Sequence, residues 1–374
     1  MGSISSYQTA EGRRYRVRYR RPDKSQTDKR GFKTKREAEL FAASVEMSMA
    51  RGEYIEASAS RVTVNELGIG WLATQTHLKP SSLRPAEIAW RVHVNPVWGT
   101  VSVGDVRHTD VQNWVSELSK KRGATTVIRA YGVLAAILDS AVRDRRLPSN
   151  PARGVNLPRK VAKEHQYLTH QQVHDLAAKS GDYETLIFVL AYTGLRWGEA
   201  IGMRASDVDF DRRRIRVSVN AVEVGTEIFV GTPKSHKRRI VAFPEFLEPA
   251  LREQLRGKTQ DDLVFPGEQG GHLRRATRGT RTWFKSALKA AELQPMTLHD
   301  LRHTAASLAV SSGGNVKAVQ RMLGHASAAM TLDVYADLFD ADLDTLAEGL
   351  NEAARKSVVG KMWARDESQG RPTP

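Results

Sequence analysis

A basic run with three prolines, residues 148–160, is the feature that most constrains how this 374-residue chain can fold. Proline has no backbone donor and interrupts helices, so the run predicts a boundary between domains. A polar segment at 57–61 predicts an earlier linker, and the length fits two or three domains of roughly 150 residues. The sequence therefore predicts a small N-terminal domain at residues 1–55, a helical domain at 63–147, a third and largest domain at 160–360, and a polar tail at 361–374.

The first of these segments alternates basic and apolar residues in the manner of a strand. Within Arg14–Arg20, Tyr15, Val17 and Tyr19 would face one side and the arginines the other. A second strand is expected near Lys29–Phe32, followed by a helix at Lys35–Met49. A solvated basic face is the simpler interpretation. The whole chain has a net charge of +15, however, and a β-sheet can enter a DNA groove. We therefore predict DNA contacts from Arg14, Arg16, Arg18, Arg20, Lys33 and Lys35.

Residues 63–147 read as mostly helical. In the segment 124–146, apolar residues recur every three or four positions, which predicts a strongly amphipathic helix. Four of the seven tryptophans fall in the middle segment, and core packing is the expected role for their large rings. These tryptophans are Trp71, Trp90, Trp98 and Trp114.

The third segment mixes helices with a short sheet. Thr169 followed by Gln172 is a capping-box pattern that starts a helix, and a second helix is expected to end near Gly194. Alternating apolar residues over 214–243 predict a short sheet, and the pattern is helical again to about Lys356. The fold class expected for the whole chain is multidomain, mainly α with small β-sheets, and its third domain is α+β.

The composition excludes several classes of protein. The chain has no cysteine, which removes disulfides, thiolate nucleophiles and cysteine-based metal sites. No apolar run approaches the roughly 18 residues of a membrane helix, and the basic start has no apolar stretch typical of a secretory signal. We therefore expect no membrane association and a cytoplasmic location.

Five short stretches in the third segment carry chemistry-bearing residues. Each is a weak signal alone, because a single arginine, lysine or tyrosine is more often a surface or core residue than a catalytic one. Their order along the chain is more informative. The stretches are Thr193–Glu199, Thr232–Ser235, Leu298–Thr304, Leu323–His325 and Leu332–Tyr335.

Taken together, these stretches resemble the tyrosine recombinase (phage integrase) family, whose pattern is Arg, Lys, His-x-x-Arg, His or Trp, and Tyr. The resemblance is strong over residues 165–350. The three-part layout is similar to that of lambda-type integrases, which implies an arm-binding domain, a helical core-binding domain and an α+β catalytic domain. The six matching positions are Arg196, Lys234, His299, Arg302, His325 and Tyr335.

These residue types suit metal-free cleavage of a phosphodiester, which needs a nucleophile, charge stabilisation and a proton for the leaving oxygen. Tyr335 can be the nucleophile, although ionising a phenol of pKa near 10 at pH 7 costs about 4 kcal/mol unless neighbours help. Two arginines offer forked donors for phosphate oxygens. Glu199, one turn after Arg196, is expected to support the site.

The resemblance also assigns roles to the other residues. It implies that Lys234 is the general acid for the 5′ oxygen, that His325 donates to a phosphate oxygen, and that His299 assists proton transfer to or from Tyr335. The implied reaction is transesterification through a 3′-phosphotyrosyl bond and a Holliday junction. It needs no ATP, metal or other cofactor, because the ester bond conserves the energy.

The family also implies the partners. These are double-stranded DNA with crossover and arm-type sites, and a homotetramer formed on that DNA. A host DNA-bending protein and a recombination directionality factor are further expectations. The biological role implied is integration or excision of a phage or integrative element, in the nucleoid or host-cell cytoplasm. The segment after Tyr335, with Leu338, Leu343, Leu346 and Leu350, reads as an amphipathic helix that packs either on its own chain or on a neighbouring protomer.

Other interpretations fit the sequence less well. His299, His303 and His325 could form a zinc site, but residue 300 is Asp where the usual helix motif has Glu, so His303 is expected to be structural. Gly257-Lys258-Thr259 resembles the end of a phosphate loop, but Arg252 replaces the required glycine. A type IB topoisomerase is less consistent with the basic arm and the helical middle domain, and an inactive DNA-binding regulator with the complete set of six residues. A chromosome-dimer resolvase usually lacks the first 55 residues.

Overall fold

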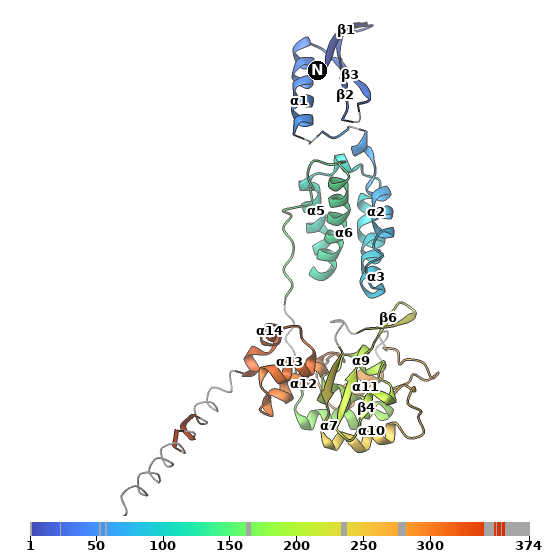
Figure 1. The fold of residues 1–374 in the computed structure, drawn as a ribbon, viewed down its shortest axis with the longest axis vertical. Coiled ribbons are helices and arrows are strands. Elements are labelled where there is room, and N and C mark those ends of the chain that lie inside the picture. Colours follow the sequence, from blue (N-terminus) through green and yellow to red (C-terminus); the bar gives the residue numbers. More distant parts are fainter. Residues whose placement is uncertain are drawn as a thin grey trace, which may run out of the picture. The chain divides into compact units, whose positions relative to one another are not determined.

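Figure 1 shows a computed structural model of the chain, which divides into two compact units at residues 1–162 and 163–374. Each unit is described by itself below. The structure describes residues 2–22, 24–51, 54–56, 58–161, 166–232, 238–275, 282–339, 348, 350–352, 354 and 355.

The first unit begins with a three-stranded antiparallel sheet and a helix, as the alternating pattern predicted. The strands are β1 (Ser3–Thr9), β2 (Gly12–Arg20) and β3 (Gln26–Phe32), in that order across the sheet, followed by α1 (Lys35–Ala50). Val17 of β2 is fully buried and the Tyr19 ring meets Phe41 of α1 edge-on, so the apolar face of β2 packs on the helix. The sequence pattern did not predict β1, which is largely polar.

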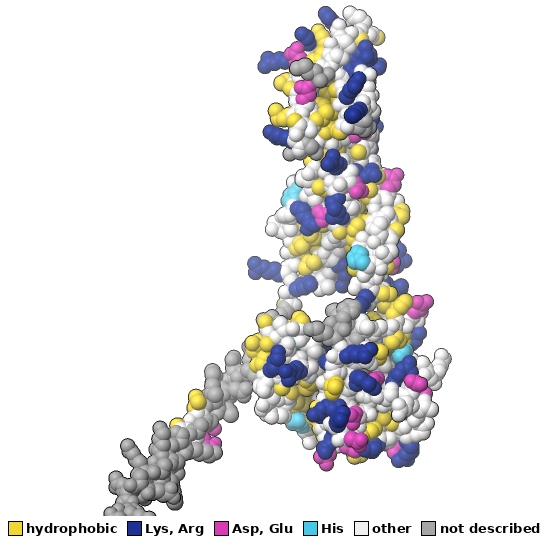
Figure 2. All heavy atoms as spheres, viewed as in Figure 1, with side chains coloured by type: hydrophobic (Ala, Val, Ile, Leu, Met, Phe, Trp, Pro, Cys, Tyr) yellow, Lys and Arg dark blue, Asp and Glu magenta, His cyan; other side chains and the backbone are white. Residues whose placement is uncertain are grey.

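The arginines of β2 lie on the opposite face of this sheet. The Nε of Arg16 donates to Ser5 Oγ of β1 over 2.8 Å, Arg14 forms an ion pair with Glu11, and Arg18 and Arg20 are exposed. Figure 2 shows Lys and Arg side chains standing out from the visible surface of this part of the chain. Lys33 and Lys35, at the start of α1, are also exposed. The basic face is thus built as predicted, and its use for DNA stays a prediction.

The rest of the first unit is helical and surrounds a core of tryptophan and aliphatic side chains. Trp90, Trp98 and Trp114 are buried and Trp71 packs against the same cluster, which confirms core packing as their role. The elements are η1 (Ala59–Arg61), α2 (Val64–Ala73), α3 (Pro80–Ala89), the π-helical turn η2 (Trp90–Val94), α4 (Asn95–Trp98), η3 (Val103–Asp105), α5 (His108–Lys121) and α6 (Ala124–Arg143).

Helix α6 is the amphipathic helix predicted for 124–146, and it ends slightly earlier than predicted. Val127, Leu134, Ile137 and Leu138 are all fully buried in the tryptophan core. Among the described residues, α6 is the single helix whose length and apolar content would allow it to cross a membrane. Its packing against α2, α3 and α5 identifies it as the central helix of this domain.

The second unit combines helices with two small antiparallel sheets, of order β4-β5-β8 and β6-β7. Its strands are β4 (Val208–Asp209), β5 (Arg214–Val217), β6 (Asn220–Val224), β7 (Glu227–Gly231) and β8 (Arg239–Ala242). Its helices are α7 (His170–Ala178), η4 (Gly181–Tyr183), α8 (Glu184–Thr193), α9 (Trp197–Ile201), η5 (Ala205–Asp207), η6 (Glu245–Leu247), α10 (Glu248–Gln254), α11 (Trp283–Ala290), α12 (Asp300–Ser311), α13 (Val316–Leu323) and α14 (Ala328–Phe339).

Two details of the sequence prediction for this unit were wrong. The region 214–243 holds parts of two sheets instead of one, because the β6–β7 hairpin pairs only with itself. Between α10 and α11, the described residues 255–275 form turns and bridges instead of helix. Gly267, Gly270 and Gly271 lie in that stretch, and glycine costs a helix about 1 kcal/mol per residue relative to alanine.

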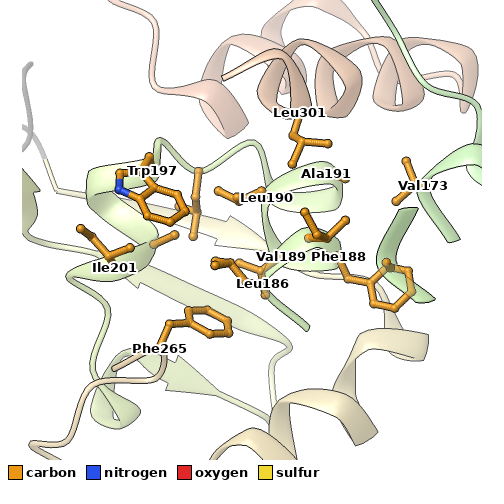
Figure 3. Close-up of a cluster of buried hydrophobic side chains, with 14 of the residues drawn as sticks. Val173, Leu186, Phe188, Val189, Leu190, Ala191, Trp197, Ile201, Phe265 and Leu301 are labelled. Carbon is orange, nitrogen blue, oxygen red and sulfur yellow. The ribbon is translucent and has the colours of Figure 1, made fainter. Parts of the chain in front are cut away.

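Helix α8 is the centre of the second unit. Leu186, Ile187, Val189 and Leu190 are almost fully buried. Figure 3 shows side chains of α8 between Leu301 of α12 and Phe265. Gly194 ends α8 in the left-handed conformation (φ +63°), and the chain turns directly into α9. The predicted capping box at Thr169 and the predicted helix end at Gly194 are both confirmed.

Candidate active site

Arg196 is the residue at which the turn after α8 enters α9. Its backbone N–H and its Nη1 both donate to the carboxylate of Glu199, each over 2.9 Å. The Arg196 side chain is about a quarter exposed, so its guanidinium reaches the surface while Glu199 fixes its position. Glu199 therefore supports Arg196 as the sequence predicted.

Glu199 is also bound by an arginine that the sequence pattern did not identify. Arg239, the first residue of β8, donates to both carboxylate oxygens over 2.8 and 2.7 Å, and its Nε donates to the carbonyl of Met322. Burial alone would raise the pKa of Glu199, but the hydrogen bonds and charge of Arg239, then of Arg196, outweigh it and lower that pKa to about 2. Arg239 sits in a basic run, where its sequence context is that of any exposed arginine.

Arg302 lies in the first turns of α12 and is almost completely buried, at 3% exposure. Its guanidinium donates to the carbonyls of Gly194 and Leu323, which end α8 and α13. Burial, and secondarily the charge of Arg196, lowers the pKa of Arg302 to about 9, so the side chain is still a cation at neutral pH. Arg302 thus joins the two turns that carry Arg196 and His325.

His325 follows Gly324, which ends α13 in the left-handed conformation. The Nδ1 of His325 is 3.0 Å from Oγ1 of Thr331 in α14. Partial burial, then the charges of Arg302 and Arg196, lowers the pKa of His325 to about 4, so the imidazole is neutral at pH 7. When Thr331 donates to Nδ1, the proton resides on Nε2, which is the donor needed for a phosphate oxygen.

Tyr335 projects from α14 into a small apolar cluster with Ala306, Val319 and Leu323, and is 1% exposed. Burial raises its pKa to about 12, although the charge of Arg302 acts in the opposite direction. Its ring lies parallel to that of His325, with centroids 6.4 Å apart. Its hydroxyl is 2.8 Å from Nδ1 of His303, a residue that the sequence led us to expect as structural.

His299 stands at the start of α12, with its ring edge-on to His303 at 5.2 Å. Loss of hydration, then the charge of Arg302, lowers the pKa of His299. The structure therefore brings five of the six predicted residues together on the turns around α12, while Lys234 lies outside the described residues. In the part of the chain that is described, no group of three His, Cys, Asp or Glu side chains is arranged to hold a metal ion.

Gly198 gives a test of how tightly this site is packed. A Cβ added there would lie 2.4 Å from the backbone oxygen of Ala221 and 2.4 Å from Oδ1 of Asn220, both in β6. Since a strand carbonyl cannot move cheaply, we expect Gly198→Ala to lower the stability of the second unit by about 1–3 kcal/mol. Thermal unfolding of the full chain measures this loss of stability. Gly231→Ala is the control, since an added Cβ meets nothing within 4 Å at that end of β7, and an equal effect of both variants would contradict the packing argument.

Comparison with known proteins agrees with this geometry. Residues 166–342 match the phage integrase family. The integrase of Mycobacterium phage D29 is 27% identical over 319 residues, covering 81% of this chain and 84% of that protein. Tyrosine recombinase XerC of Anoxybacillus flavithermus (strain DSM 21510 / WK1) is 28% identical, covering 60% of this chain and 76% of that protein.

Two solved structures share the fold. The Tn1549 transposon integrase in complex with a circular intermediate DNA has a TM-score of 0.65 and 22% identity, covering 76% of this chain and 99% of the other. A lambda integrase tetramer bound to a Holliday junction has a TM-score of 0.58 and 16% identity, covering 86% and 95%. Together with the Arg, His, Arg, His and Tyr side chains that lie in that order in the second unit, these matches identify residues 166–342 as a phage integrase domain and the chain as a site-specific tyrosine recombinase.

Proposed function

We propose that this recombinase integrates or excises a phage or other mobile element by cutting and rejoining DNA through a 3′-phosphotyrosyl bond to Tyr335. The observation that carries the proposal is that His325 lies parallel to the Tyr335 ring and the charge of Arg302 acts on its phenol, while the charge of Arg196 acts on both Arg302 and His325. The basic sheet at residues 3–32 supports an integrase over a chromosome-dimer resolvase, since it offers a second DNA-binding face.

Each side chain has a role that its surroundings suit. Arg196 and Arg302 bind the non-bridging oxygens of the scissile phosphate, and neutral His325 donates from Nε2 to the same group. Lys234 protonates the 5′ oxygen as it leaves, and His299, which is expected to assist proton transfer to or from Tyr335, lies beside His303. In the conformation described here the Tyr335 ring is enclosed, so attack requires α14 to shift far enough to bring the hydroxyl to the phosphate.

The partners follow from the same proposal. The related Tn1549 and lambda integrases were solved with a circular intermediate DNA and, as a tetramer, with a Holliday junction. For this chain we propose a homotetramer on two DNA duplexes, with residues 1–55 on arm-type sites and residues 63–147 and 160–360 on the crossover site. A host DNA-bending protein and a directionality factor complete the proposed assembly, which acts on DNA in the cytoplasm.

Covalent trapping tests this proposal. Purified protein is mixed with supercoiled plasmids that carry the DNA flanking its own gene, in EDTA and without ATP, and the reaction is stopped with SDS. We expect a protein–DNA adduct, and after nuclease digestion a nucleotide mass on the peptide that contains Tyr335. An adduct on another residue, or cleavage that appears only with added zinc, would contradict the mechanism.

The division of labour between the domains is tested by charge reversal on β2. Arg16→Glu with Arg18→Glu is expected to weaken binding to arm-type DNA and to leave cleavage at the crossover site intact. The slope of log affinity against log salt should become shallower by about 0.9 for each phosphate that the variant no longer binds. Electrophoretic mobility shift assays at a series of salt concentrations measure the affinity and hence this slope. Arg256→Glu, which removes an exposed ion pair in the second unit, is the matched control; failure of crossover cleavage in the β2 variant would refute separate roles.

A further inference from the structure

The hydroxyl of Tyr335 has a specific partner that the family pattern does not include. The Nδ1 atom of His303 lies 2.8 Å from it, and the two rings are inclined at 54° with centroids 5.6 Å apart. Both side chains lie where α14 packs on α12, and Tyr335 is 1% exposed. Water therefore has little access to the phenol, and its proton needs an acceptor within the protein.

The other two histidines of the site are less suited to that task. His325 lies parallel to the Tyr335 ring at 6.4 Å, and its Nδ1 is engaged with Thr331. His299 meets the edge of the His303 ring, so it is next to His303 and one ring further from the phenol. The geometry thus places His303 between His299 and the nucleophile.

We propose that His303 accepts the phenolic proton of Tyr335 as the hydroxyl attacks the scissile phosphate, a role that rests on the function proposed above. The 2.8 Å contact is within the range expected of a general base and its substrate proton, and the proposal requires that it is kept when α14 shifts to bring the hydroxyl to the phosphate. For Nδ1 to accept, Nε2 carries the ring proton. Among the described residues, the charged and titratable groups that face this pair are Arg302, the rings of His299 and His325, and Tyr167 near the phenol.

The need for such an acceptor is large. Burial raises the pKa of Tyr335 to about 12, so the ionised fraction at pH 7 is on the order of one in 10⁵ without help. In the proposed step the Tyr335 oxygen bonds to phosphorus, its proton moves to Nδ1 of His303, and the bond from phosphorus to the 5′ oxygen breaks. The 5′ oxygen takes a different proton, from Lys234. On rejoining, a 5′ hydroxyl attacks phosphorus and gives its proton to neutral Lys234, while the imidazolium of His303 returns its proton to the departing phenolate.

The test separates activation of the nucleophile from protonation of the leaving group. Single-turnover cleavage is measured from pH 6 to 10 on normal DNA and on DNA with a 5′-bridging phosphorothiolate, whose sulfur leaves without an acid. We expect His303→Gln and His303→Ala to be slower by about 10²–10⁴-fold on both substrates. Their rates should continue to rise with pH after the wild-type rate levels off, and added imidazole should partly restore His303→Ala.

His170→Gln is the matched control, because Nδ1 of His170 makes the same kind of contact, 2.9 Å, with the hydroxyl of Tyr192 away from the site. Rates within threefold of wild type in both His303 variants would overturn the proposal, as would full rescue by the phosphorothiolate, which would move His303 to the leaving group. Faster cleavage would also overturn it, since His303 would then restrain the tyrosine. If Tyr335→Phe still formed an adduct in the same assay, the proposed function itself would fail.

Discussion

Tyr335→Phe is expected to fold, to bind DNA like the wild-type chain, and to form no covalent adduct. The aromatic ring keeps its place beside Ala306, Val319 and Leu323, since only the hydroxyl is removed. That hydroxyl contributes a hydrogen bond with His303, worth about 1 kcal/mol, so the unfolding temperature should fall by only a few degrees. The nucleophile, by contrast, is removed entirely. SDS trapping and thermal unfolding of the same preparation measure both properties.

The matched variant is Tyr192→Phe. It removes a phenol hydroxyl from an equivalent pair with a histidine, His170, near the end of α8. It should form the adduct at the wild-type rate and lose a similar, small amount of stability. An adduct that persists in Tyr335→Phe would mean that another side chain attacks the phosphate, and the assignment of the nucleophile would be wrong.

The elements with a strong local pattern could be predicted from the sequence. The alternation in β2, the helical spacing of apolar residues in α6, the capping box at Thr169 and the glycine that ends α8 were all recognised. Strand β1 was missed because its residues are mostly polar and its stability comes from pairing with residues 12–18 of β2. The split into two sheets was missed because β5 pairs with β8 across the intervening β6–β7 hairpin, and no local pattern reports that pairing.

In the active site too, residues in short sequence motifs could be predicted, whereas residues brought in by tertiary packing could not. Order and spacing identified Arg196, Glu199 and Arg302, since those positions lie in recognisable short motifs. Arg239 and His303 could not be ranked in the same way. Arg239 matters because β8 brings it to a carboxylate 40 positions earlier in the chain, and His303 because α14 returns to α12. Only tertiary packing distinguishes these two from other arginines and histidines.

Glu199→Gln is the second change with a large expected effect, because one buried carboxylate forms ion pairs with two arginines. Glu199 is 3% exposed and accepts hydrogen bonds from both Arg196 and Arg239. An amide has one acceptor oxygen and no charge, which leaves the guanidinium of Arg239, itself 10% exposed, without its counterion. Breaking a buried pair in this way costs about 3–5 kcal/mol. Arg196 would also lose its support, and cleavage should fall by about 10²-fold through misplacement of its guanidinium.

The stability that Glu199 contributes should decrease as the pH falls. The pKa of Glu199 is about 2 in the folded chain, against an ordinary value of 4.5 when unfolded. The carboxylate therefore contributes its stability above about pH 4.5, and that contribution, about 3 kcal/mol, is lost as the pH falls from 4.5 towards 2. Urea unfolding at pH 7 and pH 3 is monitored by hydrogen exchange in α8 and α9. The free energy of unfolding of the wild type should fall between pH 7 and pH 3, whereas that of Glu199→Gln should already be low at pH 7 and change little. Glu245→Gln, in an exposed pair with Arg213, should change stability by less than about 1 kcal/mol. If Glu199→Gln behaved like this control, the buried carboxylate could not be what holds Arg196 and β8 together.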